Sequence, residues 1–188
     1  MTPASPAGVV RWPLELLPQA TTVPSAFMHE AELGIVIKGP AKMVKQADWR
    51  KAVFGYTGMI DVSARGEGRR TWPHNPMTSW LGKSFDTFAP IGPCIVTADE
   101  VPDVNKLHLT TRVNGEVRQD ASVSDLIFDV PPLIETLSRV MTLEPGDLIA
   151  TGTCAGVGIG FNPPKFLKKG DRVAITIEPV GTLENPVE

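Results

Sequence analysis

Two cysteines, one tyrosine and no long apolar run are the most informative shortages of this 188-residue chain. Cys94 and Cys154 lie far apart and form no Cys-x-x-Cys pair, so neither a disulfide framework nor a zinc finger is indicated. No stretch approaches membrane-spanning length, and the N-terminus lacks the charged and apolar regions of a secretory signal. We therefore expect a cytoplasmic protein in a reducing compartment, with no membrane partner.

The chain also lacks an excess of basic residues. Its 18 Lys and Arg are outnumbered by 21 Asp and Glu, the formal net charge is -3, and the basic residues form no stripe. Nucleic-acid-binding proteins concentrate positive charge on one face, so we expect no nucleic-acid partner. The length suffices for one core and is short for two independent domains. We expect an extended, proline-rich N-terminal arm over residues 1–24 and one folded domain over residues 25–188.

Strand signals outnumber helix signals along the chain. Asn114-Gly115 separates two runs, 107–113 and 116–123, and predicts a hairpin with a primed turn. Other signals predict a short helix over 49–52 with Asp48 as its N-cap, a helix over about 131–140 capped by Asp129, and strands over 148–151 and 173–177. A doubly wound parallel sheet would need helices between most strands. The expected fold class is therefore mainly β with a few short helices (α+β).

The stretch from His29 to Ile37 places two carboxylates two residues apart before an apolar run. Successive strand side chains alternate between faces, so Glu30 and Glu32 would share one face of a strand. Neighbouring carboxylates raise each other's pKa unless a cation or solvent absorbs the repulsion. A metal site and a solvated outer strand face both satisfy this requirement, and periodicity alone does not separate them.

Asp61 ends another short apolar run and could complete an all-oxygen triad with the two glutamates. Hard oxygen donors favour Mg²⁺, Mn²⁺ or Ca²⁺ over zinc. Arg65 and Lys83 follow among turn-forming residues, although a single basic residue is usually a surface charge.

Taken together, these motifs resemble the fumarylacetoacetate hydrolase family. The matching segments occur in the family's order and are Glu30-Ala31-Glu32-Leu33, Gly55-Tyr56-Thr57, Asp61-Val62-Ser63-Ala64-Arg65, Gly82-Lys83-Ser84-Phe85-Asp86-Thr87-Phe88, Pro90-Ile91-Gly92-Pro93, Val113-Asn114-Gly115-Glu116, Leu143-Glu144-Pro145-Gly146-Asp147 and Thr151-Gly152-Thr153. The resemblance implies a β-rich catalytic domain with a mixed β-roll or β-sandwich-like form. It also implies a homodimer and a small-molecule 2-oxo acid substrate.

The resemblance assigns the metal ligands. Glu30, Glu32 and Asp61 are expected to hold Mg²⁺ or Mn²⁺, with Ca²⁺ as a substitute. Lys83 matches the family's active-site lysine and is the expected catalytic residue.

The substrate-binding residues follow from the same resemblance. Gly152 and Thr153 match a segment that would cradle a substrate carboxylate through backbone N–H groups and a hydroxyl. Arg65 matches an arginine that either binds substrate or braces the loop carrying Asp61.

The family resemblance implies chemistry on an enol or enolate, whose oxygen a metal stabilises as a Lewis acid. We expect hydrolysis of a C–C bond in an acylpyruvate-like 2,4-dioxo acid. One alternative is decarboxylation or keto–enol tautomerisation of a 2-oxo dicarboxylic acid such as oxaloacetate. Another is a relative that binds metal without catalysis.

The sequence departs from the family's hydrolases and decarboxylases upstream of the two glutamates. Their His-x-x-Glu pair, which orients the water or base, has no match over residues 9–27. Either the chemistry differs, which strengthens the alternative of decarboxylation or tautomerisation, or this chain lacks the segment. Among the histidines, His29 is expected to be structural, His108 irrelevant, and His74 a loop candidate for a base. Cys154 is expected to be a small packed residue.

Overall fold

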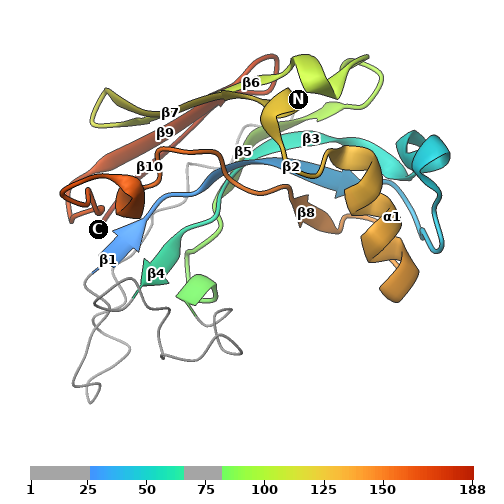
Figure 1. Cartoon of the computed structure of the whole chain (residues 1–188), viewed down its shortest axis with the longest axis horizontal. Helices are drawn as coiled ribbons and strands as arrows, with labels where there is room; N and C mark the ends of the chain where they lie inside the picture. Colours follow the sequence, from blue (N-terminus) through green and yellow to red (C-terminus); the bar gives the residue numbers. More distant parts are fainter. Residues whose placement is uncertain (1–25, 66–81) are drawn as a thin grey trace.

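The computed structural model describes residues 26–65 and 82–188 of the chain. Two antiparallel four-stranded sheets face each other in Figure 1. The first has the order β5-β3-β2-β8 and consists of β5 (Ile91–Thr97), β3 (Val53–Ile60), β2 (Ala31–Ile37) and β8 (Leu148–Ala150). The second has the order β10-β9-β6-β7 and consists of β10 (Gly181–Pro186), β9 (Arg172–Ile177), β6 (His108–Val113) and β7 (Glu116–Ser122).

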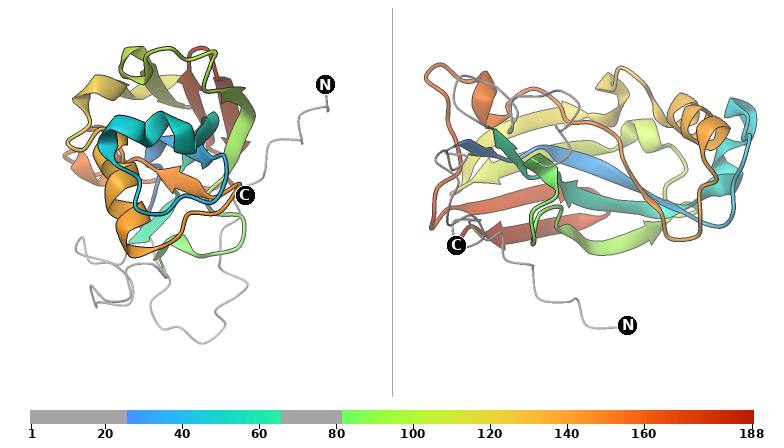
Figure 2. Two further views of the ribbon diagram at one scale, coloured as in Figure 1. Left: turned by 90° about the vertical axis from the view of Figure 1, so that its right-hand side faces the viewer. Right: turned by 90° about the horizontal axis from the view of Figure 1, so that it is seen from below.

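Shorter elements close the two ends of this sandwich. At one end β1 (Ala26–Met28) pairs with β4 (Ser63–Arg65). At the other end the 3-10 helix η2 (Gln46–Ala52) packs against α1 (Val130–Val140), as the left view of Figure 2 shows. Further 3-10 turns are η5 (Val104–Lys106), η6 (Val123–Asp125) and η7 (Gly158–Gly160). The predicted class, mainly β with short helices, is confirmed.

The core lies between the two sheets. Ile35 of β2, Tyr56 of β3 and Ile175 of β9 are all buried in it. Gly58 of β3 faces β9, and a Cβ at Gly58 would lie 3.1 Å from the Cδ1 atom of Ile175. The absence of a side chain at this position therefore lets the two sheets approach closely.

All seven residues of β2 are buried, so this strand is covered on both faces. The second sheet covers one side of β2, and the residues around the predicted metal site cover the other at its N-terminal end. The alternative of two solvated glutamates is excluded by this burial.

The predicted hairpin is confirmed. Val113 of β6 pairs with Glu116 of β7, and the two residues between them have positive φ angles, 52° at Asn114 and 84° at Gly115. The primed turn needs these angles at both positions.

The predicted helices are confirmed with corrected starts. The first begins at Gln46 after Lys45, and Asp48 lies inside its first turn, 2.6 Å from the ammonium of Lys51. Asp48 is therefore not the N-cap, because the helix begins two residues before it and Lys45 occupies the N-cap position. The second begins at Val130, and the side chain of Asp129 makes no capping hydrogen bond.

The expected arm over residues 1–24 lies outside the described residues, and the boundary at residue 25 stays a prediction. In the described part of the chain, no helix is long and apolar enough to cross a membrane.

Candidate metal centre

Antiparallel pairing of β2 with β3 brings three carboxylates together. Glu30 immediately precedes β2, Glu32 is its second residue, and Asp61 follows the last residue of β3. Ala31 pairs with Ile60, and the Asp61 N–H donates to the Glu30 carbonyl at 2.7 Å, which extends the ladder by one step. One oxygen from each carboxylate lies within 4.8 Å of the others.

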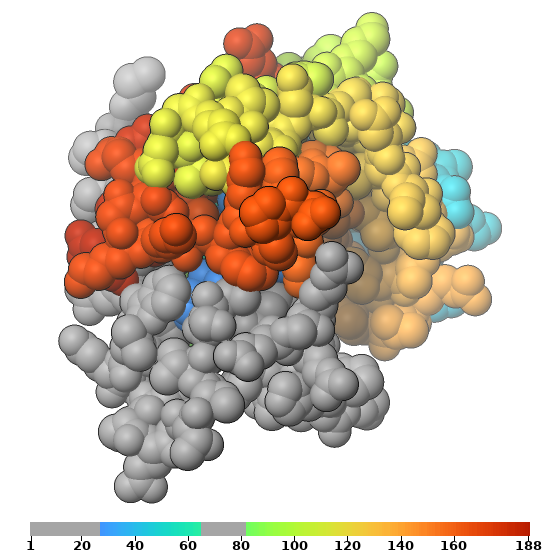
Figure 3. Space-filling model, turned by 60° about the vertical axis from the view of Figure 1, so that its left-hand side comes forward, coloured from blue at the N-terminus to red at the C-terminus, as the bar shows by residue number. Residues whose placement is uncertain are grey.

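This cluster is sheltered from solvent. Glu30 is 8% exposed and Glu32 is 3% exposed. In Figure 3 the surface of the segment after β8, in orange, lies beside the small blue area of the N-terminal strands. That segment is anchored where the Leu167 N–H donates to the Phe27 carbonyl at 2.7 Å. Buried carboxylates at this spacing require a cation, because their mutual repulsion is poorly screened away from water.

Glu32 is the carboxylate of the cluster whose ionised form is most clearly disfavoured by burial. Burial raises the pKa of its carboxyl group to about 7, the N–H of Gly152 opposes the rise, and the Asp61 charge adds to it. The Gly152 N–H donates to Oε2 of Glu32 at 2.8 Å. Three carboxylates with hard oxygen donors converge here, and their negative charges are costly without a cation. This arrangement fits a divalent ion such as Mg²⁺ or Mn²⁺.

Lys83 supplies positive charge at this centre. Its Nζ donates to Oε2 of Glu30 at 2.8 Å and also to Oδ2 of Asp61. Burial alone would lower the pKa of Lys83, but the hydrogen bonds to Asp61 and Glu30 more than offset it and raise the pKa. Lys83 therefore carries its proton while it bridges two of the three expected ligands.

The segment that follows β8 runs alongside β2 and holds Glu32 in place. Thr151 donates to the Leu33 carbonyl through its N–H at 3.2 Å and its hydroxyl at 2.9 Å. The Thr153 hydroxyl donates to the Ala31 carbonyl at 3.0 Å. The N–H of Gly152 and the hydroxyl of Thr153 are thus occupied by β2, and their expected role toward a substrate stays a prediction.

A glycine is required at position 152 by its φ of +99°, although a Cβ at this position would have open space around it. We expect Gly152→Ala to cost about 1 kcal/mol of stability and to weaken Mn²⁺ binding, because the strained backbone shifts the N–H that orients Glu32. Calorimetric titration and thermal unfolding measure the two effects.

Gly170 provides a matched control, since its φ is +93° and it also has open space around it. It lies in the turn before β9, where its N–H donates to the Val187 carbonyl. Gly170→Ala should lose similar stability and keep the parent affinity for Mn²⁺. Equal affinities in both variants would contradict the role given to Gly152.

Sequence reasoning missed Gln119 of β7, which is 1% exposed and contacts both segments of the site. Its Oε1 accepts from the Ala31 N–H, and its Nε2 donates to Thr153 Oγ1. A buried side-chain amide rarely lacks hydrogen-bond partners. A glutamine on the inward face of a strand was therefore the sequence signal that could have pointed to Gln119.

The histidines fall into three different surroundings. His29 is fully buried beside Gln119, and burial lowers its pKa, which agrees with a structural role. His108 is exposed and contacts Asp120. His74 lies outside the described residues, so its role as a candidate base stays a prediction.

Arg65 is the last residue of β4, and its assigned role also stays a prediction. Cys154 is half-buried against the core, and burial raises the pKa of its thiol. Both observations agree with packing rather than reactivity, as expected for Cys154.

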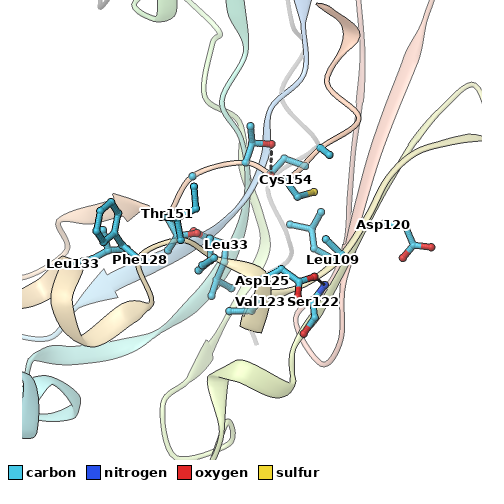
Figure 4. A pocket seen from close by; sticks show the side chains of 17 residues that line it. Leu33, Leu109, Asp120, Ser122, Val123, Asp125, Phe128, Leu133, Thr151 and Cys154 are labelled. Atoms are coloured by element: carbon cyan, nitrogen blue, oxygen red, sulfur yellow. Dashed lines mark hydrogen bonds between the residues drawn. The ribbon is translucent and has the colours of Figure 1, made fainter. Parts of the chain in front are cut away.

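The same segment after β8 forms a wall of a cavity of about 600 Å³ (Figure 4). Its lining includes Leu33, Phe128, Thr151 and Cys154, together with Gly152 and Thr153. None of the three carboxylates lines it. The cavity therefore lies behind the segment that orients Glu32, and the acidic centre is a separate feature.

The raised pKa of Glu32 predicts a pH dependence for metal binding. A metal ligand must be ionised, so below the pKa of about 7 each bound ion must displace a proton from Glu32. We expect Mn²⁺ affinity to fall about tenfold for each pH unit below that value. Titration calorimetry in buffers of different ionisation enthalpy measures both affinity and proton release, and a flat affinity between about pH 5.5 and about pH 8 would contradict this.

Comparison with known proteins places these residues in context. The sequence profile of the fumarylacetoacetate (FAA) hydrolase C-terminal family matches residues 2–188. The chain is 48% identical over 165 residues to oxaloacetate tautomerase YisK of Bacillus subtilis strain 168, covering 88% of this chain and 53% of YisK. It is 44% identical over 162 residues to the mitochondrial oxaloacetate tautomerase FAHD2A of Bos taurus, covering 84% and 49%.

A solved structure shows a related fold with ligands. Maleylpyruvate hydrolase from Sphingobium sp. SYK-6, in complex with manganese(II) and pyruvate, superposes with a TM-score of 0.73 at 40% identity, covering 86% of this chain and 54% of that one. This chain thus spans about half the length of the relatives it matches. The profile match and these identities show that the chain belongs to the fumarylacetoacetate hydrolase family of enzymes.

Proposed function

We propose that this chain carries the catalytic centre of a metal-dependent tautomerase that interconverts the keto and enol forms of oxaloacetate or a similar 2-oxo dicarboxylic acid. The observation that carries the proposal is the 48% identity to an oxaloacetate tautomerase over 88% of the chain. The relatives thus support the tautomerase alternative better than the hydrolysis that was expected first. Tautomerisation also needs no attacking water.

The three carboxylates are the proposed binding site for Mg²⁺ or Mn²⁺. Glu30, Glu32 and Asp61 present hard oxygen atoms within 4.8 Å of one another, and two of the three residues are buried. A divalent ion held there would supply a Lewis acid that favours negative charge on the enol oxygen. The manganese(II) in the related hydrolase structure supports this choice of metal.

Lys83 is the proposed catalytic residue. In keto–enol tautomerisation a base takes a proton from C3 and a second proton joins the carbonyl oxygen, so charge develops on that oxygen. The predicted loop residue His74 is the proposed acceptor of the C3 proton. Lys83 Nζ holds a proton at the edge of the carboxylate cluster, and its side chain is 33% exposed. An ammonium with three donors can hydrogen-bond the developing enolate oxygen and exchange a proton with it.

Binding of the substrate's carboxylates is assigned to the remaining predicted residues, Arg65, Gly152 and Thr153. Arg65 is the last residue of β4, and Gly152 lies two residues after the end of β8. A homodimer is proposed from the family resemblance, and light scattering coupled to gel filtration tests it.

Hydrolysis is the second candidate function, and the 40% identity to maleylpyruvate hydrolase favours it. Both reactions share an enolate and differ in whether a C–C bond breaks. Mass-resolved turnover of oxaloacetate and a panel of acylpyruvates separates them. Tautomerisation conserves substrate mass with isotope exchange at C3, hydrolysis yields two fragments, and decarboxylation releases CO₂. Two fragments from any acylpyruvate at a higher rate than oxaloacetate exchange would overturn the tautomerase proposal.

A further inference from the structure

Gln119 connects the two sheets at the acidic centre. It lies in β7 of the second sheet, whereas the carboxylates belong to β2 and β3 of the first. Its side chain is buried, so every polar atom of the amide needs a partner inside the protein.

The carbonyl side of the amide holds the residues around the glutamates. Oε1 of Gln119 accepts from the backbone N–H of Ala31 at 3.2 Å and lies 2.9 Å from Nδ1 of His29. These two residues flank Glu30, and Ala31 also separates it from Glu32. The Thr111 hydroxyl, from the neighbouring strand β6, donates to the same oxygen at 3.3 Å.

The Nε2 atom of the Gln119 amide hydrogen-bonds the segment after β8. Nε2 of Gln119 donates to Thr153 Oγ1 at 2.8 Å and to the Cys154 carbonyl at 3.0 Å, with Cys154 Sγ at 3.4 Å. Thr153 in turn donates to the Ala31 carbonyl at 3.0 Å, which closes a ring of hydrogen bonds through Gln119. The orientation of the amide is fixed by this ring, because the Ala31 N–H can only face an acceptor.

From this geometry we infer that Gln119 is a positioning residue for the metal centre. One amide fixes the backbone between Glu30 and Glu32, and it also fixes the segment whose Gly152 N–H orients Glu32. It acts from the facing sheet, so the spacing between the sheets and the placement of the ligands are coupled. This inference rests on the metal centre proposed above. It adds a residue that holds the backbone beside the carboxylates.

The hydrogen bonds of Gln119 give it a role beyond filling space in the core. An apolar side chain of the same length would fill the space but leave the Ala31 N–H and the Thr153 hydroxyl oxygen without this partner. The backbone around Glu30 and Glu32 would then be free to turn toward other acceptors. Loss of an outer partner that hydrogen-bonds a metal ligand typically weakens metal binding about 10- to 100-fold. Gln119 instead fixes the backbone between and beside the proposed ligands, and we expect a loss in the same range.

Gln119→Met tests the inference, because methionine keeps the length and volume of the side chain and removes its hydrogen bonds. Ser138→Ala is the matched control. Ser138 is also fully buried and bonded, accepting from the Val44 N–H at 3.0 Å and donating to the Glu135 carbonyl, but it belongs to α1 at the opposite end of the sandwich. Both variants lose buried hydrogen bonds, and only one lies at the acidic centre.

The readout is Mn²⁺ affinity by titration calorimetry at low temperature, beside the thermal midpoint of the metal-free proteins. We expect Gln119→Met to weaken Mn²⁺ binding about 10- to 100-fold and Ser138→Ala to change it less than about twofold, although both lower the midpoint. Gln119→Asn keeps the amide on a shorter side chain that cannot bridge both contact sets, and we expect an intermediate affinity.

The outcomes separate the inference from the proposed function. A parent protein that binds no Mn²⁺ means that the proposed metal centre is wrong. A parent that binds it, with folded Gln119→Met at the parent's affinity, overturns the role of Gln119 alone. If neither Gln119 variant folds at low temperature while Ser138→Ala does, Gln119 is a determinant of the fold and the inference is also wrong.

Discussion

Replacing Glu32 with glutamine or alanine is expected to abolish both Mn²⁺ binding and turnover. Glu32 contributes one of three carboxylates to the cluster, and a neutral amide is a much weaker ligand for a hard cation. The loss of affinity should exceed the roughly 100-fold cost of losing an outer partner of a metal ligand. Titration calorimetry measures binding, and enol absorbance measures turnover.

The stability of the metal-free protein distinguishes a ligand from a structural residue. Burial raises the pKa of Glu32 to about 7, so its ionised form opposes folding at higher pH. Above that pH the metal-free Glu32→Gln variant should unfold at the parent's temperature or higher, since the amide still accepts from Gly152. Glu100→Ala, at an exposed glutamate that accepts from Thr97, is the control and should change neither property. Retained turnover in Glu32→Gln would remove this residue from the site.

Replacing Lys83 with methionine is expected to separate turnover from metal binding. Lys83 donates to Glu30 and Asp61 and so competes with a cation for the same oxygens. Mn²⁺ affinity should therefore stay equal or rise in Lys83→Met. Turnover should fall about 10²- to 10⁴-fold, as expected when a group that transfers a proton is lost.

Two controls make the Lys83 result specific. Lys168→Met removes an exposed lysine next to the turn before β9 and should leave turnover and affinity unchanged. Lys83→Arg keeps the positive charge but has a pKa too high for ready proton exchange. Lys83→Arg should therefore have the parent's stability in the absence of metal, but its turnover should stay as low as that of Lys83→Met. A parent-like turnover in Lys83→Met would show that the lysine serves only to neutralise Glu30 and Asp61.

The residues of the acidic cluster were readable because they lie in short motifs. The family resemblance assigned Glu30, Glu32 and Asp61 as ligands, which stays a prediction, and antiparallel pairing of β2 with β3 brings one oxygen of each within 4.8 Å of the others. The hairpin at Asn114-Gly115 was predicted for a similar reason, since a primed turn depends on two adjacent residues.

Long-range features were not readable in the same way. The burial of β2 on both faces depends on which sheet lies opposite, and that pairing joins residues far apart in the chain. The strands β3, β5 and β10 were not predicted as elements, although motifs in β3 and β5 were noted. An inward-facing glutamine is the one local signal at Gln119, and its partners, which lie 88 and 90 positions away in the chain, could not be read from it.

The hydroxyl of Thr153 illustrates a further limit of motif reading. The motif suggested a donor directed at a substrate, whereas the hydroxyl donates to the Ala31 carbonyl and accepts from Gln119. The glycine-containing segment therefore organises the ligands in this structure. The motif identified the segment from Thr151 to Thr153 as part of the site. The hydrogen-bond partners of each atom then show which group it contacts.

Tautomerisation at this metal centre is tested most directly by the decay of enol-oxaloacetate absorbance on addition of the protein with Mn²⁺ and then with EDTA. We expect a rapid, metal-dependent approach to the keto–enol equilibrium with no loss of substrate mass, abolished by EDTA and absent in Glu32→Gln. A decay that persists in EDTA or in Glu32→Gln, or that releases CO₂ in step with the absorbance, would contradict tautomerisation at this metal centre.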